Sequence, residues 1–407
     1  MNALIARQPI VDAAQRIFAY ELLYRSEEGG SFASLRDDEL TGKLAANLSY
    51  SFEQSSVLTG KPCFMNFGEH GLRKQLYRVF EPEQLIIEIL ETVTPGPEAR
   101  EACERAKREG YRLALDDYDW RQPPEILHEL ADFVKVDVLA TPMDVCRDLV
   151  RRFQPAGVTL LAEKVETHTQ FGELREMGYQ LFQGYYFEKP KTLQSKRPPG
   201  MSVRRLQILR TLLHGELDLR KLAPLIAQEA TIAFRLLRYA NSAMHHSVNP
   251  IRNLDQCLTY LGEDKVRTLL MLVVLQDLGA QSNEALMEAC TVRAAVCRGI
   301  AERAGEQSGA EPSFLTGLLS LLDAMVVCPM ETALEGMPLD PEIRAALLGC
   351  DGGGTPQQAL ALARAWERAD WDSALSIGSE LGLRLEDLQA VFSDSLLWAR
   401  DLAAAGR

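Results

Sequence analysis

Polar side chains, several of which could bind a metal, recur along the first half of the 407-residue chain, at or near the C-terminal ends of short apolar runs. The members of this series are Glu21, Asn66, Glu88, Asp116, Asp117, Lys135, Asp137, Glu163 and Gln183. A single polar residue in a strand is more often solvated or hydrogen-bonded for structural reasons. A series that reaches one rim is harder to explain in that way, because unpaired buried charges are costly.

Carboxylates crowded onto one rim repel one another unless a cation neutralises them. The candidate ligands in the series are oxygens, without His or Cys, which selects Mg²⁺ or Mn²⁺ over zinc. Asp116 and Asp117 are adjacent, and both could turn towards the rim where the strand runs out and so serve two metals. Lys135 and Asp137 share one strand face, which can be the inner one. An oxygen-ligand site beside a lysine suits phosphoryl chemistry.

The elements that must position these residues are eight β-rich runs that alternate with helical segments up to about residue 190. The runs are IARQPIV, IFAYELLY, KPCFMNF, LIIEIL, RLALDDY, FVKVDVL, VTLLAEKV and YQLFQGYYF. The helical patterns include TGKLAANLSYSFEQ, PEAREACERAKREG and THTQFGELREMG, of which the last two end on Gly110 and Gly178 as helix caps. We expect an α/β fold, a TIM-like (β/α)8 barrel whose strand ends converge on one rim. Because only DAAQR joins the first two runs, they should pair antiparallel.

The second half of the chain is helical in pattern. Residues 191–200, KTLQSKRPPG, are rich in Pro and basic residues and predict an exposed linker. Amphipathic stretches follow, with no convincing strand: DLRKLAPLIAQ, TIAFRLLRYANSA, NLDQCLTYLG ending on Gly262, and DKVRTLLMLVVLQDL. The predicted organisation is therefore a barrel over residues 1–190 and an all-α domain over residues 201–407.

The charge and hydropathy of the chain limit the partners and the cellular compartment that we expect for it. The net charge of -13 opposes attraction to polyanions, so neither nucleic acid nor an anionic membrane is expected as a partner. The run LLMLVVL is far shorter than a membrane span, and MNALIARQPI lacks the apolar region of a signal peptide, which favours a cytoplasmic protein. An anionic small ligand would need a local cation, either a metal or well-placed Arg and Lys.

The series of residues resembles a known family. ELLYR looks like the E-A-L-x-R signature of EAL domains, which are barrel phosphodiesterases that linearise cyclic di-GMP to pGpG with Mg²⁺ or Mn²⁺. The likeness continues in order through FMNF, LIIEILET, LALDDY, VKVD, LAEKVE and FQGYYF, so that it covers essentially residues 1 to 190. Seven ordered matches are a specific signal.

The resemblance implies a role for each matched residue. The metal-binding set would be Glu21, Asn66, Glu88, Asp116, Asp117 and Glu163. Lys135 would hold or deprotonate the attacking water and Glu166 would support the site. Arg25 would contact a ligand phosphate, and Gln183 would contact substrate or water. Glu91 matches a glutamate that positions the loop after the paired aspartates.

The chain departs from the EAL pattern at three places. Leu22 replaces the signature Ala, Lys164 replaces a Gly, and DDYDWRQPP replaces the loop D-D-F-G-T-G. That loop links the metal site to the dimer interface in active family members, so the altered loop leaves a homodimer open. Without its glycines, the loop cannot readily form the same positive-φ turns. Lys164 either is a solvated residue or alters the field of the site.

The second half resembles an HDOD domain, a helical module related to HD metallohydrolases. The resemblance rests on IAFRLLRYANSA, CLTYLG and SFLTGLLSLLDAM. Where an HD hydrolase would have G-L-L-H-D, this chain has Gly317, Leu318, Leu319, Ser320 and Leu321, and no His-Asp pair occurs anywhere in it. This half is therefore expected to bind protein partners or to regulate the barrel.

Two functions follow from these resemblances. In the first, the barrel is a metal-dependent phosphodiesterase that hydrolyses cyclic di-GMP to pGpG, with a regulatory HDOD half. In the second, the altered loop prevents assembly of the site, and the barrel is a degenerate nucleotide sensor or interaction scaffold. The complete series of ligands supports the first, and the DDYDWRQPP loop supports the second.

Overall fold

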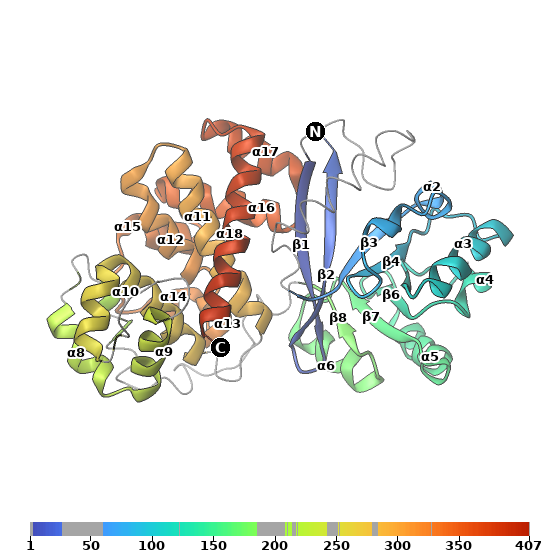
Figure 1. Cartoon of the computed structure of the whole chain (residues 1–407), viewed down its shortest axis with the longest axis horizontal. Coiled ribbons are helices and arrows are strands. Elements are labelled where there is room, and N and C mark those ends of the chain that lie inside the picture. The colour runs from blue at the N-terminus through green and yellow to red at the C-terminus, as the bar shows by residue number, and fades with distance from the viewer. Residues whose placement is uncertain are drawn as a thin grey trace. The chain divides into compact units, whose positions relative to one another are not determined.

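The computed structural model describes residues 3–26, 60–121, 123–184, 208–209, 211–213, 217, 219–241, 251, 253–278, 284–326 and 328–406. The strands close into a barrel in the order β1 to β8 (Figure 1). They are β1 (Ala3–Asp12), β2 (Ile17–Ser26), β3 (Cys63–Phe67), β4 (Leu85–Ile89), β5 (Arg112–Leu115), β6 (Phe133–Asp137), β7 (Thr159–Glu163) and β8 (Leu181–Phe182). The predicted (β/α)8-type barrel is confirmed.

Strand β1 is antiparallel to both of its neighbours. It pairs antiparallel with β2, so that Gln8 lies opposite Glu21 and Ile10 opposite Ala19, and it is also antiparallel to β8. The connection from β1 to β2 is too short for a crossover helix, and it turns through Gln15 at a positive φ of 62°. The other adjacent strand pairs, from β2/β3 to β7/β8, are parallel. The antiparallel start that the DAAQR turn predicted is therefore confirmed.

An apolar cluster fills the barrel with one residue from every strand. Its members are Ile10, Ala19, Phe64, Ile86, Ala114, Phe133, Leu161 and Leu181. The rings of Phe64 and Phe133 meet edge to face, with centroids 5.3 Å apart. The next layer of side chains along the strands towards the rim lies on this cluster.

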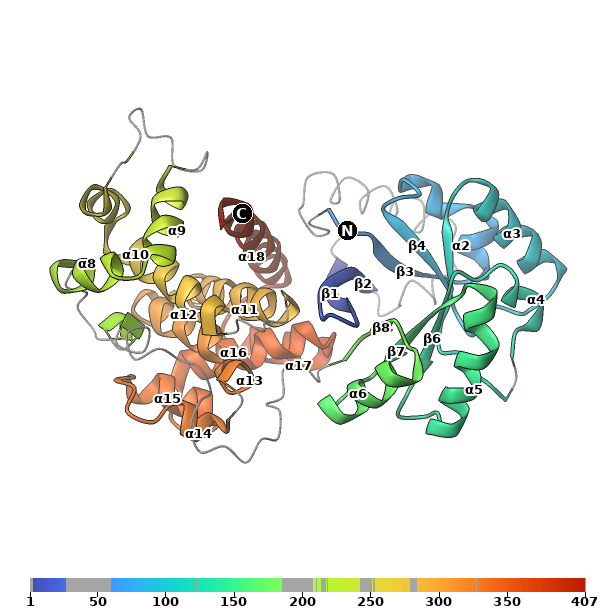
Figure 2. The same ribbon diagram turned by 90° about the horizontal axis from the view of Figure 1, so that it is seen from below.

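Helices cover the outside of the barrel (Figure 2). They are α2 (Glu69–Arg73), η2 (Leu76–Val79), α3 (Pro97–Arg108), α4 (Glu125–His128), α5 (Met143–Phe153), η3 (Gln154–Ala156) and α6 (His168–Met177). Helix α6 begins with a capping box between Thr167 and Gln170, and it ends on Gly178 at φ 117°. Helix α3 is followed by Gly110 at φ 95°, as its sequence predicted. The predicted helix TGKLAANLSYSFEQ lies outside the described residues.

The described part of the second half is helical throughout, as predicted. Its elements are α8 (Leu219–Ala227), α9 (Ala230–Ala240), α10 (Leu254–Leu278), α11 (Glu284–Arg303), η5 (Gln307–Gly309), α12 (Ala310–Leu319), α13 (Leu322–Val326), α14 (Met330–Ala333), α15 (Pro341–Leu348), α16 (Gly354–Glu367), α17 (Trp371–Glu380) and α18 (Leu385–Gly406). Helix α10 is kinked where Gly262 leaves the helical region at φ 75° and ψ 168°. The sequence therefore located this helix break at the right glycine.

The contacts divide the chain into two compact units. The first comprises residues 1–189 with 364–393, and the second comprises residues 190–363 with 394–407. Within the first unit, the indole N–H of Trp366 donates to the carbonyl of Ile5 at 3.0 Å. The predicted linker 191–200 lies outside the described residues, and the boundaries 1–190 and 201–407 stay predictions.

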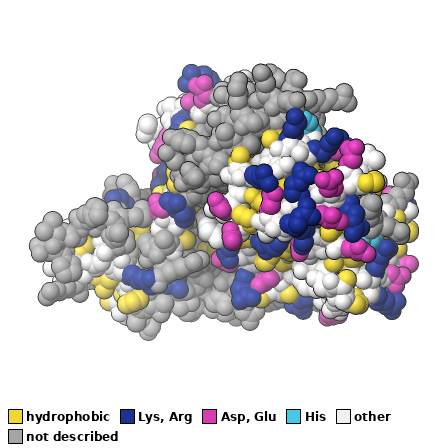
Figure 3. All heavy atoms as spheres, turned by 45° about the vertical axis from the view of Figure 1, so that its right-hand side comes forward, with side chains coloured by type: hydrophobic (Ala, Val, Ile, Leu, Met, Phe, Trp, Pro, Cys, Tyr) yellow, Lys and Arg dark blue, Asp and Glu magenta, His cyan; other side chains and the backbone are white. Residues whose placement is uncertain are grey.

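Surface charges of both signs are interspersed on the face that Figure 3 presents. Several on and around α3 form ion pairs, such as Arg78 with Glu109 and Arg100 with Glu104. Such exposed pairs are screened by solvent and contribute little to stability. Among the described residues, no helix is long and apolar enough to cross a membrane.

Candidate active site

A polar layer lies directly above the apolar cluster in the barrel. Alternate residues of a strand share a face, so the next inward side chain lies two positions along from each cluster member. On β2 to β8, that step leads to one polar residue for each strand, either within the strand or directly after it. These residues are Glu21, Asn66, Glu88, Asp116, Lys135, Glu163 and Gln183. On β1, which runs the other way, the same step leads backwards to Gln8. The period of the strands therefore brings one polar side chain from every strand to this level.

The ammonium of Lys135 lies at the centre of four carboxylates. Its Nζ is 2.6 Å from Glu88 Oε1, 2.8 Å from Asp116 Oδ1, 2.8 Å from Glu163 Oε1 and 3.4 Å from Glu21 Oε1. The side chains of Lys135 and Glu88 are 1% and 0% exposed. Four potential negative charges thus face one positive charge in a buried site, which leaves an excess of negative charge.

The pKa values of the cluster reflect this excess. Burial raises the pKa of Glu163 to about 8, although Lys135 opposes the shift. Burial likewise raises the pKa of Glu88 well above its usual value, and the neighbouring Glu21 and Asp116 add to the rise. Burial alone would lower the pKa of Lys135, but the surrounding carboxylates outweigh it and raise that pKa well above normal. The lysine is therefore held as an ammonium, while Glu163 and Glu88 keep their protons to a higher pH than a free glutamate does.

The donor set fits a hard divalent cation. The side-chain oxygen of Asn66 faces only acceptors, and its amide would have to be reversed to donate to Asp116 at 3.3 Å and Glu88 at 3.1 Å. Oxygens that face oxygens in this way are what a shared cation would bind. Gln183 Oε1 is also buried without a hydrogen-bond partner in the described structure. With Lys135 at the centre, no three Asp, Glu, His or Cys among the described residues are arranged to hold a metal as they stand.

Gln183 joins the carboxylate cluster to β1. Its Nε2 donates to Glu21 Oε2 at 2.5 Å and to Gln8 Oε1 at 2.9 Å, and Gln8 Nε2 reaches the carbonyl of Glu367 at 3.4 Å. Gln8 was missed in the sequence because the series followed the C-terminal ends of the runs. The short turn after β1 makes this strand antiparallel to both neighbours, so the N-terminal part of β1 lies at the rim. That turn is the sequence feature from which Gln8 could have been predicted.

Asp117, Asp137 and Lys164 form the outer edge of the site. Asp117 is exposed and has a left-handed φ of 38°. Such a backbone conformation is uncommon outside glycine and occurs at functional sites. Asp137 Oδ1 accepts from the backbone of Leu139 and Ala140, and its Oδ2 lies 2.5 Å from Lys164 Nζ. Lys164 and backbone hydrogen bonds overcome the effect of burial and lower the pKa of Asp137.

The remaining predicted residues lie outside the buried cluster. Arg25 is in β2, where its backbone pairs with Leu4, and its side chain is not among the described atoms. Glu91 is exposed in the turn after β4. Glu166 is exposed between β7 and α6, and its backbone N–H donates to Gln170 Oε1 at 3.0 Å. The roles of these three residues stay predictions.

Comparison with known proteins assigns the family. A model of the EAL domain matches residues 64–190, and a model of the HDOD domain matches residues 199–335. The chain is 31% identical over 402 residues to the cyclic di-GMP phosphodiesterase CdgJ of Vibrio cholerae, and the match covers 98% of this chain and 92% of CdgJ. The chain is an EAL–HDOD protein. It is also 28% identical over 413 residues to the uncharacterized protein YuxH of Bacillus subtilis, with 100% of both chains covered.

Two solved structures resemble part of this EAL–HDOD protein. BlrP1 of Klebsiella pneumoniae in a complex with calcium and cyclic di-GMP is 25% identical, with 46% of this chain and 55% of that chain covered and a TM-score of 0.39. An EAL domain protein of Listeria monocytogenes is 23% identical, with 46% and 87% covered and a TM-score of 0.37.

The altered loop of the EAL domain is anchored by an aromatic residue. Tyr118 is buried, its backbone N–H donates to the carbonyl of Lys135 at 3.1 Å, and its ring meets that of Phe153 edge to face. Its hydroxyl lies 3.2 Å from His128 Nε2 at the end of α4. Among the described loop residues, Asp117 alone takes a positive φ. The loop is therefore held by Tyr118 and by the helix that starts after Pro124.

Lys164 of the EAL domain provides a test of backbone strain. It replaces a family glycine, yet it keeps a left-handed φ of 56°. We expect Lys164→Gly to be more stable than Lys164→Ala by about 1 kcal/mol, because both lose the ion pair with Asp137 but only alanine keeps the left-handed penalty. Chemical denaturation measures the difference. Equal stabilities would show that the left-handed conformation is not retained in solution.

Gln8 provides a test of positioning in the EAL domain. Gln8→Ala removes an acceptor that orients Gln183 and, through it, Glu21. We expect kcat for cyclic di-GMP to fall about tenfold, since one hydrogen bond contributes about 1 kcal/mol, with little change in the melting temperature. Gln84→Ala, an exposed glutamine beside β4, is the matched control. Unchanged turnover in Gln8→Ala would remove Gln8 from the site.

Proposed function

We propose that this EAL–HDOD protein is a metal-dependent phosphodiesterase that hydrolyses cyclic di-GMP to pGpG. The observation that carries the proposal is the set of four carboxylates that converge on the buried ammonium of Lys135 at the barrel rim. The similarity to CdgJ over 98% of the chain supports the same activity and substrate. The HDOD half would regulate the barrel or bind protein partners, and a homodimer stays a prediction.

Mg²⁺ or Mn²⁺ fits the oxygen donors of this site. Glu21, Asn66, Glu88 and Asp116 would hold the cation, with Glu163 and Asp117 as further ligands. When bound, the cation supplies positive charge that lowers the pKa of water and stabilises the charge that develops on the phosphoryl group. It would also supply the counter-charge that Lys135 alone does not provide for four carboxylates.

The residues of the chain orient the water and the substrate. Lys135 would donate from Nζ to the attacking water and to the phosphate oxygen on which charge develops. Gln183 would keep Glu21 in place through its bond of 2.5 Å. Arg25 would bind a phosphate of the dinucleotide. In the reaction the water oxygen bonds to phosphorus, one P–O ester bond breaks, and a proton from water ends on the released ribose oxygen.

The test is a direct assay of the full chain. The protein is incubated with cyclic di-GMP and either Mg²⁺ or Mn²⁺, and the products are separated chromatographically. Conversion to pGpG is expected for the wild type and not for Glu163→Gln, which keeps the size of the side chain but removes its charge. The variant also excludes a contaminating phosphodiesterase.

The opposite outcome has a definite meaning. If both proteins are folded and neither turns over cyclic di-GMP with either metal, the enzymatic proposal is wrong. The barrel would then be a sensor if calorimetry shows that it binds cyclic di-GMP, and a scaffold if it does not.

A further inference from the structure

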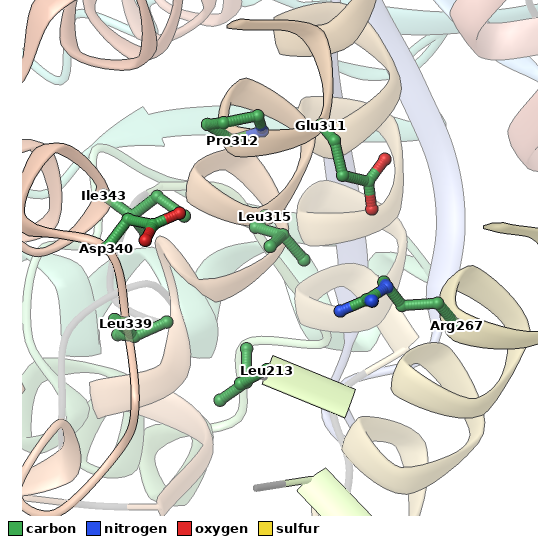
Figure 4. A pocket seen from close by; sticks show the side chains of 8 residues that line it. All are labelled: Leu213, Arg267, Glu311, Pro312, Leu315, Leu339, Asp340 and Ile343. Carbon is green, nitrogen blue, oxygen red and sulfur yellow. The ribbon is translucent and has the colours of Figure 1, made fainter. Parts of the chain in front are cut away.

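The second unit contains a cavity of about 180 Å³. Its lining residues are Leu213, Arg267, Glu311, Pro312, Leu315, Leu339, Asp340 and Ile343 (Figure 4). One water molecule occupies roughly 30 Å³, so this space is much larger than a water site. It is smaller than the roughly 300–1,000 Å³ of pockets that hold drug-sized ligands. The volume therefore suits one ring system rather than a whole dinucleotide.

Glu311 presents an acceptor to this cavity. It lies in the first turn of α12, and its Oε2 is 2.8 Å from Arg298 Nη2. Arg298 in turn lies over the ring of Phe314 at 3.9 Å, which fixes the orientation of the carboxylate. Glu311 Oε1 is buried and has no hydrogen-bond partner among the described residues. That oxygen is closed to solvent, but the side chain as a whole is 40% exposed. A carboxylate has about four acceptor sites, so Glu311 can pair with Arg298 and also accept a ligand N–H.

Arg267 and Asp340 add a donor and a second acceptor to the lining. Arg267, on α10, is 9% exposed and donates to the backbone carbonyl of Leu212. A guanidinium has five N–H groups, so it can bind this carbonyl and a ligand acceptor together. Asp340 precedes α15 as its N-cap residue, but its side chain makes no capping hydrogen bond. Figure 4 shows these charged side chains around the apolar Leu315.

We propose that this cavity binds a guanine base. Guanine offers adjacent N–H donors that a carboxylate accepts, and it offers O6 and N7 as acceptors for an arginine. The apolar side chains of the lining would contact the faces of the ring. With two carboxylates in the lining, a phosphate is disfavoured inside and would stay outside the cavity. The choice of guanine rests on the proposed function, because a guanine nucleotide is then both substrate and product of the barrel.

In the first test, GMP is the probe. It is titrated into the whole chain in EDTA, and its binding is measured by calorimetry. GMP should bind with a Kd below about 1 mM, and AMP at least about tenfold more weakly, because a hydrogen-bonding site rejects a ligand with mismatched donors. Glu311→Gln should weaken GMP binding about tenfold or more, since the carboxylate charge is lost while the side-chain size is kept. Glu306→Gln, which changes an exposed glutamate outside the lining, is the matched control and should bind GMP as the wild type does.

Competition then identifies the source of the base. Displacement of GMP by pGpG would assign the site to the product, and displacement by cyclic di-GMP alone would assign it to the substrate. Equal binding of AMP and GMP, or GMP binding that is unchanged by Glu311→Gln, would overturn the proposal. The two proposals fail separately: turnover without Glu311-dependent GMP binding removes only the cavity site, and Glu311-dependent binding without turnover removes only the phosphodiesterase.

Discussion

Lys135→Met is expected to reduce turnover of cyclic di-GMP by about 10³-fold or more. The Nζ of Lys135 contacts four carboxylates, and in the proposed reaction it holds the attacking water. Removing a preorganised donor from such a site costs roughly 10²–10³ in kcat, and loss of the water-holding group adds to this. The measurement is kcat with saturating Mn²⁺, beside Lys107→Met as a control that removes a partly exposed lysine paired with Asp132.

The same substitution separates the structural role of Lys135 from its catalytic role. Without the ammonium, the buried carboxylates lose their only close cation among the described residues, and breaking such a cluster typically destabilises a protein by about 3–5 kcal/mol. In EDTA, the melting temperature of Lys135→Met should therefore be below that of the wild type. Mn²⁺ should restore the melting temperature but not the turnover. If Mn²⁺ restored both, Lys135 would be a counter-ion without a role in the reaction.

The metal-free protein is expected to lose stability as the pH rises. In the folded chain burial raises the pKa of Glu163 to about 8, compared with 4.5 for a free glutamate, and the pKa of Glu88 is raised as well. Between pH 4.5 and about 8 the folded state therefore binds more protons than the unfolded state. Under this condition the free energy of unfolding falls with rising pH, by about 1.4 kcal/mol for each unit of pKa shift.

Bound Mg²⁺ or Mn²⁺ should weaken this dependence of stability on pH. A cation binds the ionised carboxylates, so metal affinity and the stability it contributes rise with pH over the same window. We expect the melting temperature in EDTA to drop from pH 6 to pH 9, and the drop to be much smaller with saturating metal. Glu163→Gln in EDTA is the control, and it should lose a large part of the drop. Parallel curves with and without metal would show that these carboxylates do not bind the cation.

Much of the barrel and its site could be read from the sequence because local pattern determines local geometry. Eight apolar runs, glycine caps at Gly110 and Gly178, and the short DAAQR turn were enough to predict a closed barrel with an antiparallel start. The period of two along each strand then carries the polar residues at the strand ends to one level. The helix break at Gly262 was also readable, because glycine alone adopts that backbone conformation readily.

The tertiary structure decided which of these residues meet. The local sequence could not show that Asp116 contacts Lys135 while Asp117, next to it, is exposed at φ 38°. Nor could it show that Lys164 pairs with Asp137. Gln8 joins the site only because β1 is reversed and the barrel closes β1 onto β8. The cavity at Glu311 likewise combines residues from Leu213 to Ile343. Composition and period determine which face a side chain takes, whereas contacts between distant segments depend on how the chain closes on itself.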